Sequence, residues 1–174
     1  MVKNNITMEN ARIGFRNFSG AEGKFNPAGR KNFCVFIDRD VALKLEDDKW
    51  NIKWLNPRDE GDEPQAYLQV SVAYNIMAPK IVLISSHGKT ILTDETVSLL
   101  DWAEVKTIDL IIRPYNWDVN GKSGVKAYIK SMYVTIMEDE FEQKYRDVPD
   151  TALKAIAAPS NQDPNYVEAE YEDA

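Results

Sequence analysis

Aromatic and cationic side chains alternate in two neighbouring stretches, a pattern suited to a flat, negatively charged ligand. Successive side chains of a β-strand point to opposite faces, so every second residue shares a face. Aromatic rings stack on unpaired bases at about 1–3 kcal/mol each while Lys and Arg neutralise phosphates, so such a face suits single-stranded nucleic acid. A double helix would hide its base faces from these rings. The side chains that share this face are Arg113, Tyr115, Trp117, Lys126, Tyr128 and Lys130.

A second basic and aromatic stretch lies near the start of the chain. Alternation there places Arg12, Arg16 and Phe18 on one face of a strand, opposite Ile13 and Phe15, although a bulge would reverse some of these assignments. The glycine-containing segment that follows could close over a bound strand. Tyr115, Trp117, Tyr128 and Phe18 are the candidate base stackers. Further candidates for nucleic-acid contact are Lys24, Phe25, Arg30, Lys31 and Lys122.

Residues that could support catalysis lack the spacing that catalysis needs. Asp94 with Glu95, or Asp38 with Asp40, could bind Mg²⁺ in a nuclease, but two-metal chemistry needs several converging carboxylates. The single cysteine, Cys34, lies among apolar residues and is predicted to be a buried, unreactive side chain. We therefore predict that the protein is not an enzyme and that it uses no metal or cofactor.

The charge of the chain is concentrated at one end. Residues 138–174 contain 11 acidic and 3 basic residues. The whole chain has 28 acidic and 21 basic residues, so residues 1–137 contain 17 acidic and 18 basic ones. Residues 160–174 have too few apolar side chains to offset the entropy of ordering them. We predict a folded domain at 1–140 and an acidic, largely flexible tail at 141–174. The candidate partner-binding residues of the tail are Tyr166, Glu168, Glu170, Tyr171, Glu172 and Asp173.

Alternation with period two dominates from Ala11 to Met137 and predicts a mainly β domain. A short helix is predicted at Val41–Asp47, capped by Asp40, and further helical turns at 138–146 and 151–158. Asn120-Gly121 predicts a hairpin, either with a two-residue turn or with a longer loop. No apolar stretch reaches the 18 residues of a membrane span. The predicted strands are 11–18, 30–38, 50–55, 66–74, 80–85, 89–92, 107–117 and 124–137.

Four segments carry a resemblance to a known family: Ala11–Phe15, Phe33–Asp38, Arg113–Trp117 and Gly121–Tyr128. They resemble the single-stranded-DNA-binding proteins of tailed phages, over roughly residues 5 to 140. The resemblance implies an OB-fold-like five-stranded antiparallel barrel with an extra hairpin and a short helix. It also implies a protein that coats and protects single-stranded DNA in phage replication and recombination, in the cytoplasm of the host cell.

The resemblance further implies that the acidic tail recruits replication or recombination proteins and competes for the DNA groove. Tails of related proteins commonly finish with an aromatic residue, whereas this sequence finishes Glu172-Asp173-Ala174, so Tyr166 or Tyr171 would take that role. One alternative function is a phage structural or assembly β-domain whose aromatic surface contacts other subunits. A metal-dependent nuclease is the next alternative.

Overall fold

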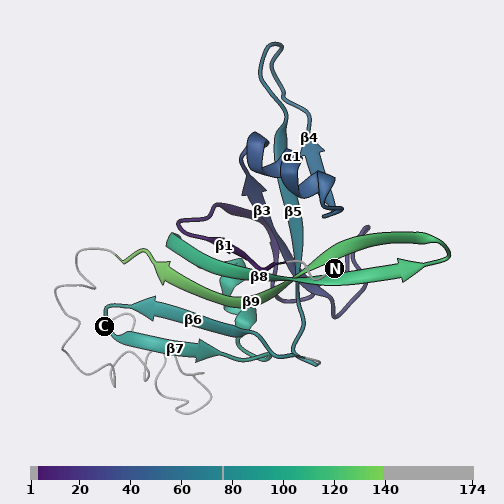
Figure 1. The fold of residues 1–174 in the computed structure, drawn as a ribbon. Helices are drawn as coiled ribbons and strands as arrows, with labels where there is room; N and C mark the ends of the chain where they lie inside the picture. Colours follow the sequence, from purple (N-terminus) through teal and green to yellow (C-terminus); the bar gives the residue numbers. More distant parts are fainter. Residues whose placement is uncertain (1–3, 76, 139–174) are drawn as a thin grey trace, which may run out of the picture. The chain divides into compact units, whose positions relative to one another are not determined.

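The computed structural model describes residues 4–75 and 77–138, and in this part of the chain nine β-strands surround a single core (Figure 1). Contacts divide the chain into residues 1–137 and 138–174, and the fold described here is that of the first unit. One α-helix, α1 (Arg39–Asp47), follows β3, and a 3₁₀ helix, η1 (Val97–Asp101), precedes β8. The strands are β1 (Ile6–Met8), β2 (Ile13–Asn17), β3 (Lys31–Ile37), β4 (Ile52–Leu55), β5 (Gln65–Val72), β6 (Lys80–Ser85), β7 (Gly88–Leu92), β8 (Val105–Val119) and β9 (Lys122–Ile136).

Strand β5 shows how alternation builds the core. Ala66, Leu68, Val70 and Val72 are buried, because every second side chain of the strand points inward. The intervening side chains define an outer face of the sheet, which carries the functional residues described below. The largest fully buried side chains contributed by the other strands include Phe33, Leu110, Ile112, Ile129 and Met132.

The strands pair in the order β1-β8-β9-β5-β3-β2, with β4 added to β5, β6 to β9 and β7 to β6. Pairing is antiparallel except between β5 and β9 and between β6 and β9. The sheet is not closed, but β1 and β2 stand at its two ends and are consecutive in the chain. The amide of Ala11 donates to the Ile108 carbonyl oxygen at 2.7 Å, so the segment between β1 and β2 joins these two ends.

The mainly β prediction with one short helix is confirmed, and all eight predicted strands are present. The structure differs from a five-stranded antiparallel barrel in its larger number of strands, its open sheet and its two parallel pairings. The sequence patterns missed β1 and η1, each too short to show a repeat of its own. The helical turns predicted at 138–146 and 151–158 lie outside the described residues, except for Glu138.

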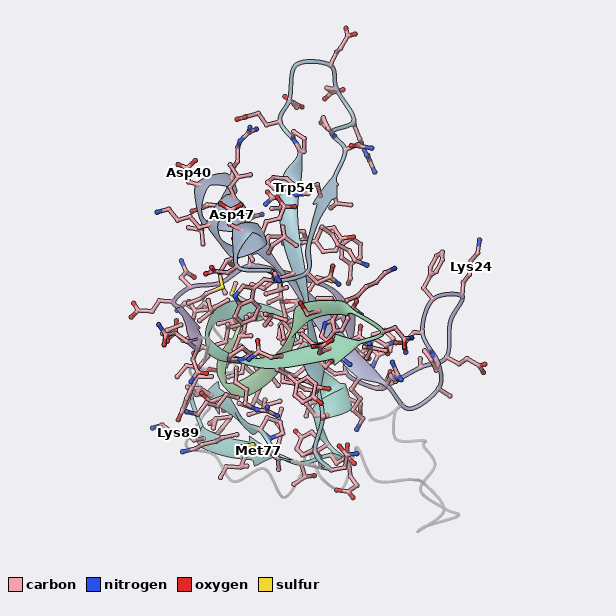
Figure 2. All side chains as sticks on the ribbon, turned by 45° about the vertical axis from the view of Figure 1, so that its right-hand side comes forward. Lys24, Asp40, Asp47, Trp54, Met77 and Lys89 are labelled. Carbon is pink, nitrogen blue, oxygen red and sulfur yellow. The ribbon has the colours of Figure 1, made fainter. Side chains whose placement is uncertain are left out.

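Helix α1 begins one residue after Asp38, which is its N-cap and makes no side-chain capping hydrogen bond. The prediction that Asp40 caps the helix is therefore wrong, because Asp40 already lies in the first turn, where its charge favours the positive end of the helix dipole. Figure 2 labels Asp40 and Asp47 on α1 and Trp54 on β4. The Trp54 indole Nε1 donates to Glu46 Oε2 at 3.1 Å and ties β4 to the helix.

The turn between β8 and β9 consists of Asn120 and Gly121, because Val119 pairs directly with Lys122. Both turn residues have positive φ, 53° and 79°, which the tight hairpin turn requires. The two-residue alternative is therefore the one adopted. Figure 1 shows this long β8–β9 hairpin reaching well beyond the neighbouring strands.

The turn between β4 and β5, residues 56–64, lies at the far end of another hairpin (Figure 1) and is strongly acidic in sequence. It contains Asp59, Glu60, Asp62 and Glu63, and Glu63 Oε1 accepts a hydrogen bond from Arg39 Nη1 at 3.0 Å. This turn places a group of carboxylates beyond the start of β5. Among the described residues, no helix combines the length and the apolar composition needed to cross a bilayer.

Candidate nucleic-acid interface

A groove of about 950 Å³ lies against the outer face of β5. Five segments that are distant in sequence line it: the loop that leads into β3, the residues before β4, the outer face and end of β5, Asp94 after β7, and the β8–β9 hairpin. We call this cavity the groove. Its aromatic and cationic lining residues are Phe25, Arg30, Lys31, Lys49, Trp50, Tyr74, Trp117, Lys126 and Tyr128.

One face of the β8–β9 hairpin gathers rings and cations around Tyr128. In the strand register Arg113 is opposite Tyr128 and Tyr115 is opposite Lys126, and directly paired residues share a face. The Tyr115 and Tyr128 rings meet edge to face, with centroids 5.9 Å apart. The Arg113 guanidinium carbon lies 5.0 Å from the Tyr128 ring centroid and Lys126 Nζ lies 5.2 Å from it. We call this surface, which also includes Trp117, the hairpin face.

The Trp117 ring lies directly against Gly124, its partner across the hairpin. A Cβ atom on Gly124 would stand 2.7 Å from the nearest indole carbon, so only glycine leaves room for this ring position. Trp117 is 37% exposed and Tyr115 is 52% exposed. Both rings are therefore accessible to a ligand, as base stacking requires.

The loop between β2 and β3 holds Phe25 beside the groove with 90% of its surface exposed. The Asn26 side-chain amide donates to the carbonyl oxygens of Ala21, Pro27 and Arg30 at 2.9, 3.1 and 3.0 Å, which fixes the path of this loop. Lys24 Nζ lies 5.4 Å from the Phe25 ring centroid. Figure 2 shows Lys24 at the tip of the loop, standing away from the sheet.

Lys31 is held inside the groove by an ion pair. Its ammonium lies 2.6 Å from Asp94 Oδ1 and also donates to the Asp94 carbonyl oxygen. Beside this pair, burial and secondarily the charge of Asp94 raise the pKa of Tyr74 to about 12, so the phenol stays neutral. A phosphate that approached Lys31 would compete with Asp94 for the same ammonium.

Phe18 is buried, and its prediction as a base stacker is wrong. Pairing between β2 and β3 shifts register between Gly14 and Asn17, so the alternation that places Phe18 outside and Phe15 inside is reversed. Phe18 instead stacks on Phe33 in the core, with ring centroids 5.1 Å apart.

Arg16 lies at the edge of β2 and contacts the segment around η1 rather than the groove. Its guanidinium Nη1 donates to the carbonyl oxygens of Leu100 and Ala103 at 2.9 and 2.8 Å. A structural role accounts for these contacts. Lys24 and Arg113, described above, also lie outside the groove lining. The remaining predicted cations outside it are Arg12 beside Phe36, Lys122 next to the hairpin turn and Lys130 at a register shift in β9.

Sequence reasoning missed several polar residues of the groove. Lys49, which has a positive φ of 72°, donates from Nζ to Ser123 Oγ at 3.3 Å and so reaches the hairpin. Its own segment is acidic, which concealed its role. The other missed polar residues, which no local pattern distinguishes, are Asn26, Asn32, Asn51, Gln69, Ser71, Asn75, Asp94 and Ser123. The predicted tail residues 166–173 lie outside the described residues.

Carboxylates of the described residues do not converge. Within residues 4–75 and 77–138 there is no group of three or more His, Cys, Asp or Glu side chains placed to hold a metal ion. Asp94, one of the acids considered for a nuclease site, is paired with Lys31. This region therefore offers no donor set for the two-metal chemistry considered above.

A family model described as "Putative phage ssDNA-binding domain" matches residues 1–173. Comparison with curated proteins gives no match. Among solved structures, the single-stranded DNA-binding protein from bacteriophage Enc34 is 13% identical, with a TM-score of 0.49 over 79% of this chain and 83% of that one. The same phage protein in complex with ssDNA gives 11% identity and a TM-score of 0.48 over 79% and 89% of the two chains.

Proposed function

The chain belongs to the phage ssDNA-binding domain family, and from this membership together with the groove we propose that it binds single-stranded DNA. An extended strand lies along the groove with its bases on Tyr128, Trp117 and Tyr115. Its phosphates lie near Arg30, Lys49 and other cations of the rim. Every base has a flat face to stack, so this mode of binding has little sequence preference.

The observation that carries the proposal is the hairpin face, where accessible rings and cations alternate beside a groove. Around Tyr128, a ring and two cations lie within 6 Å. This spacing lets one nucleotide stack on a ring while its phosphate meets a cation. In duplex DNA the base faces are covered by neighbouring base pairs, so the same surface favours unpaired strands.

In the cell, the protein coats and protects exposed strands during phage DNA replication and recombination, in the host cytoplasm. The acidic residues at 138–174 act as a tethered polyanion that competes with DNA for the cationic groove and recruits replication or recombination proteins. The charge contrast of −8 in this segment against +1 in residues 1–137 supports this competition. Removal of residues 162–174 would then tighten DNA binding severalfold at low salt.

The proposal is tested by titrating labelled oligonucleotides with the protein and following fluorescence anisotropy at two salt concentrations. We expect binding to single strands well above binding to duplexes, with log K falling by about 0.7 per neutralised phosphate for each unit of log salt. Trp117→Ala should weaken binding about tenfold. Trp102→Ala is the matched control, because Trp102 is 84% exposed and does not line the groove. Equal binding to single and double strands, or equal effects of the two variants, would contradict the proposal.

A further inference from the structure

A second group of aromatic rings lies on the outer face of β2, β3 and β5. The Phe15 ring centroid is 6.3 Å from that of Phe36 and 5.7 Å from that of Tyr67, with tilted planes. Phe15 is 59% exposed, which is unusual for a phenylalanine on a regular strand. The Arg12 guanidinium carbon lies 5.2 Å from the Phe36 ring centroid. We call Arg12, Phe15, Phe36 and Tyr67 the platform.

The backbone at the platform adopts a conformation that a phenylalanine normally avoids. Phe15 has a φ of 48°, and the register of β2 shifts here. A non-glycine residue in this region costs on the order of 1 kcal/mol or more, and such strain concentrates at functional sites. Here the strain turns an apolar ring out of the core and into solvent.

A glycine makes room for the platform. A Cβ atom on Gly14 would stand 2.9 Å from two carbons of the Phe36 ring, so a side chain at this position would displace that ring. The irregular strand and the adjacent glycine therefore act together to build an exposed aromatic surface. Folding alone would be served better by a regular β2 with Phe15 buried.

The platform continues the floor of the groove. Tyr67, Gln69 and Ser71 alternate along β5 and share its outer face, and Gln69 and Ser71 line the groove. In the register Ser71 is opposite Tyr128 on one side, while Tyr67 is opposite Phe36 on the other. Four residues of a strand span about 13 Å, which about four nucleotides cover at a stacked spacing of 3.4 Å.

The charges at the platform suit a phosphate backbone. Arg12 Nη2 donates to the side-chain amide oxygen of Gln65 at 3.2 Å. Because this amide is neutral, it does not neutralise the positive charge of Arg12. Lys53 is exposed on β4 directly opposite Tyr67. Two cations therefore flank three rings, which repeats the composition of the hairpin face.

We infer that the platform is a second base-stacking site for the strand that occupies the groove, so that one DNA track runs from the hairpin face to Phe15. This inference rests on the proposed function. In addition, occupancy of the platform depends on the length of the DNA strand. A strand that fills only the groove does not reach Phe15, whereas a longer strand stacks on both the hairpin face and the platform.

The test compares Phe15→Ala and Phe15→Asn with the unchanged protein on labelled oligothymidylates of about 4 and about 16 nucleotides. Asparagine tolerates positive φ, so the second variant keeps the backbone and removes only the ring. We expect unchanged affinity for the short strand and about tenfold weaker binding of the long one. Ile91→Ala, an exposed apolar residue of β7, is the control and should change neither.

Equal affinities for the long strand in the variants and the unchanged protein would overturn the inference, as would equal losses for both lengths. A change in oligomeric state of the Phe15 variants without the length-dependent loss would assign the platform to a second copy of the chain and also overturn it. If the unchanged protein binds neither oligonucleotide, the proposed function fails as well. If it binds both and the variants match it, only the platform inference fails.

Discussion

The hairpin face and the platform each place an aromatic ring against a glycine, but their backbones achieve this differently. Trp117 lies on Gly124 in a hairpin of regular register, whereas Phe36 lies over Gly14 beside a register shift with a positive φ at Phe15. The hairpin face exposes its rings by ordinary alternation. The platform exposes Phe15 only because the strand departs from alternation.

Their surroundings differ as well. The groove beside the hairpin face is bounded by a loop with an internally hydrogen-bonded path and contains the carboxylate of Asp94. The platform lies on an open sheet, and its cation Arg12 is bonded to a neutral amide. A bounded site desolvates its ligand more fully than a flat one, so we expect the groove to supply most of the affinity and the platform to extend the site.

The largest effect should follow from removing two rings of the hairpin face together. We expect Trp117→Ala combined with Tyr128→Ala to weaken binding of both short and long strands about a hundredfold, because each ring stacks a base at about 1–3 kcal/mol. Anisotropy titrations with the two lengths measure this loss. A smaller loss than that caused by Phe15→Ala on long strands would reverse the ranking of the two sites.

Filling the two glycine positions tests whether ring placement matters equally at both sites. Neither Gly124 nor Gly14 has a positive φ, so alanine there tests the space alone. We expect Gly124→Ala to weaken binding of both lengths about tenfold, since Trp117 must move. Gly14→Ala should weaken only long strands.

Chemical denaturation separates these glycine effects from loss of stability. Overpacking costs typically about 1–3 kcal/mol, and the exposed Trp117 ring can swing aside more easily than the half-buried Phe36 ring. We therefore expect Gly14→Ala to lower the free energy of unfolding more than Gly124→Ala does. The opposite order would show that the hairpin, rather than the platform, is the more tightly packed site.

Releasing Lys31 from its ion pair should strengthen the groove without affecting the platform. In Asp94→Asn the ammonium is free to meet a phosphate, and we expect up to about fivefold tighter binding of short strands. The slope of log K against log salt should steepen by about 0.7. Asp109→Asn, on β8 outside the groove lining, is a control for the loss of one negative charge. An equal gain in the control would indicate a general charge effect.

The smallest effects concern two neutral groups, one in the groove and one on β3. Burial raises the pKa of Tyr74 in the groove to about 12 and that of Cys34, which lies two residues before Phe36 on β3, to about 11. The unfolded chain loses these protons at lower pH, so the stability contributed by the neutral phenol is complete below pH 10 and declines from pH 10 to 12. Tyr74→Phe should reduce the fall in the free energy of unfolding, measured in urea, between pH 10 and pH 12. The same fall in the variant as in the unchanged protein would contradict this prediction.

Alternation predicted the hairpin face from sequence because β8 and β9 keep their register from Arg113 to Trp117 and from Gly124 to Tyr128. The same rule failed at β2, where Phe18 is inside and Phe15 outside. Gly14 is a residue type that often marks a bulge, but whether the register shifts there depends on how the neighbouring strands pair, which the sequence does not show. The sequence also does not predict that Lys49 and Asp94 line the groove, because they come together only when distant segments fold.

The β4–β5 turn, which precedes the platform residue Tyr67 on β5, carries four carboxylates against Arg58, and one of them, Glu63, is paired with Arg39. Its net negative charge opposes the phosphates of any strand that continues in that direction. At the other end of the track, Lys122 and Lys126 on the hairpin outnumber Asp118. A molecule on a long strand thus has a repelling end and an attracting end. On the proposed DNA track, two neighbouring molecules that face the same way would bring this acidic end against that basic end.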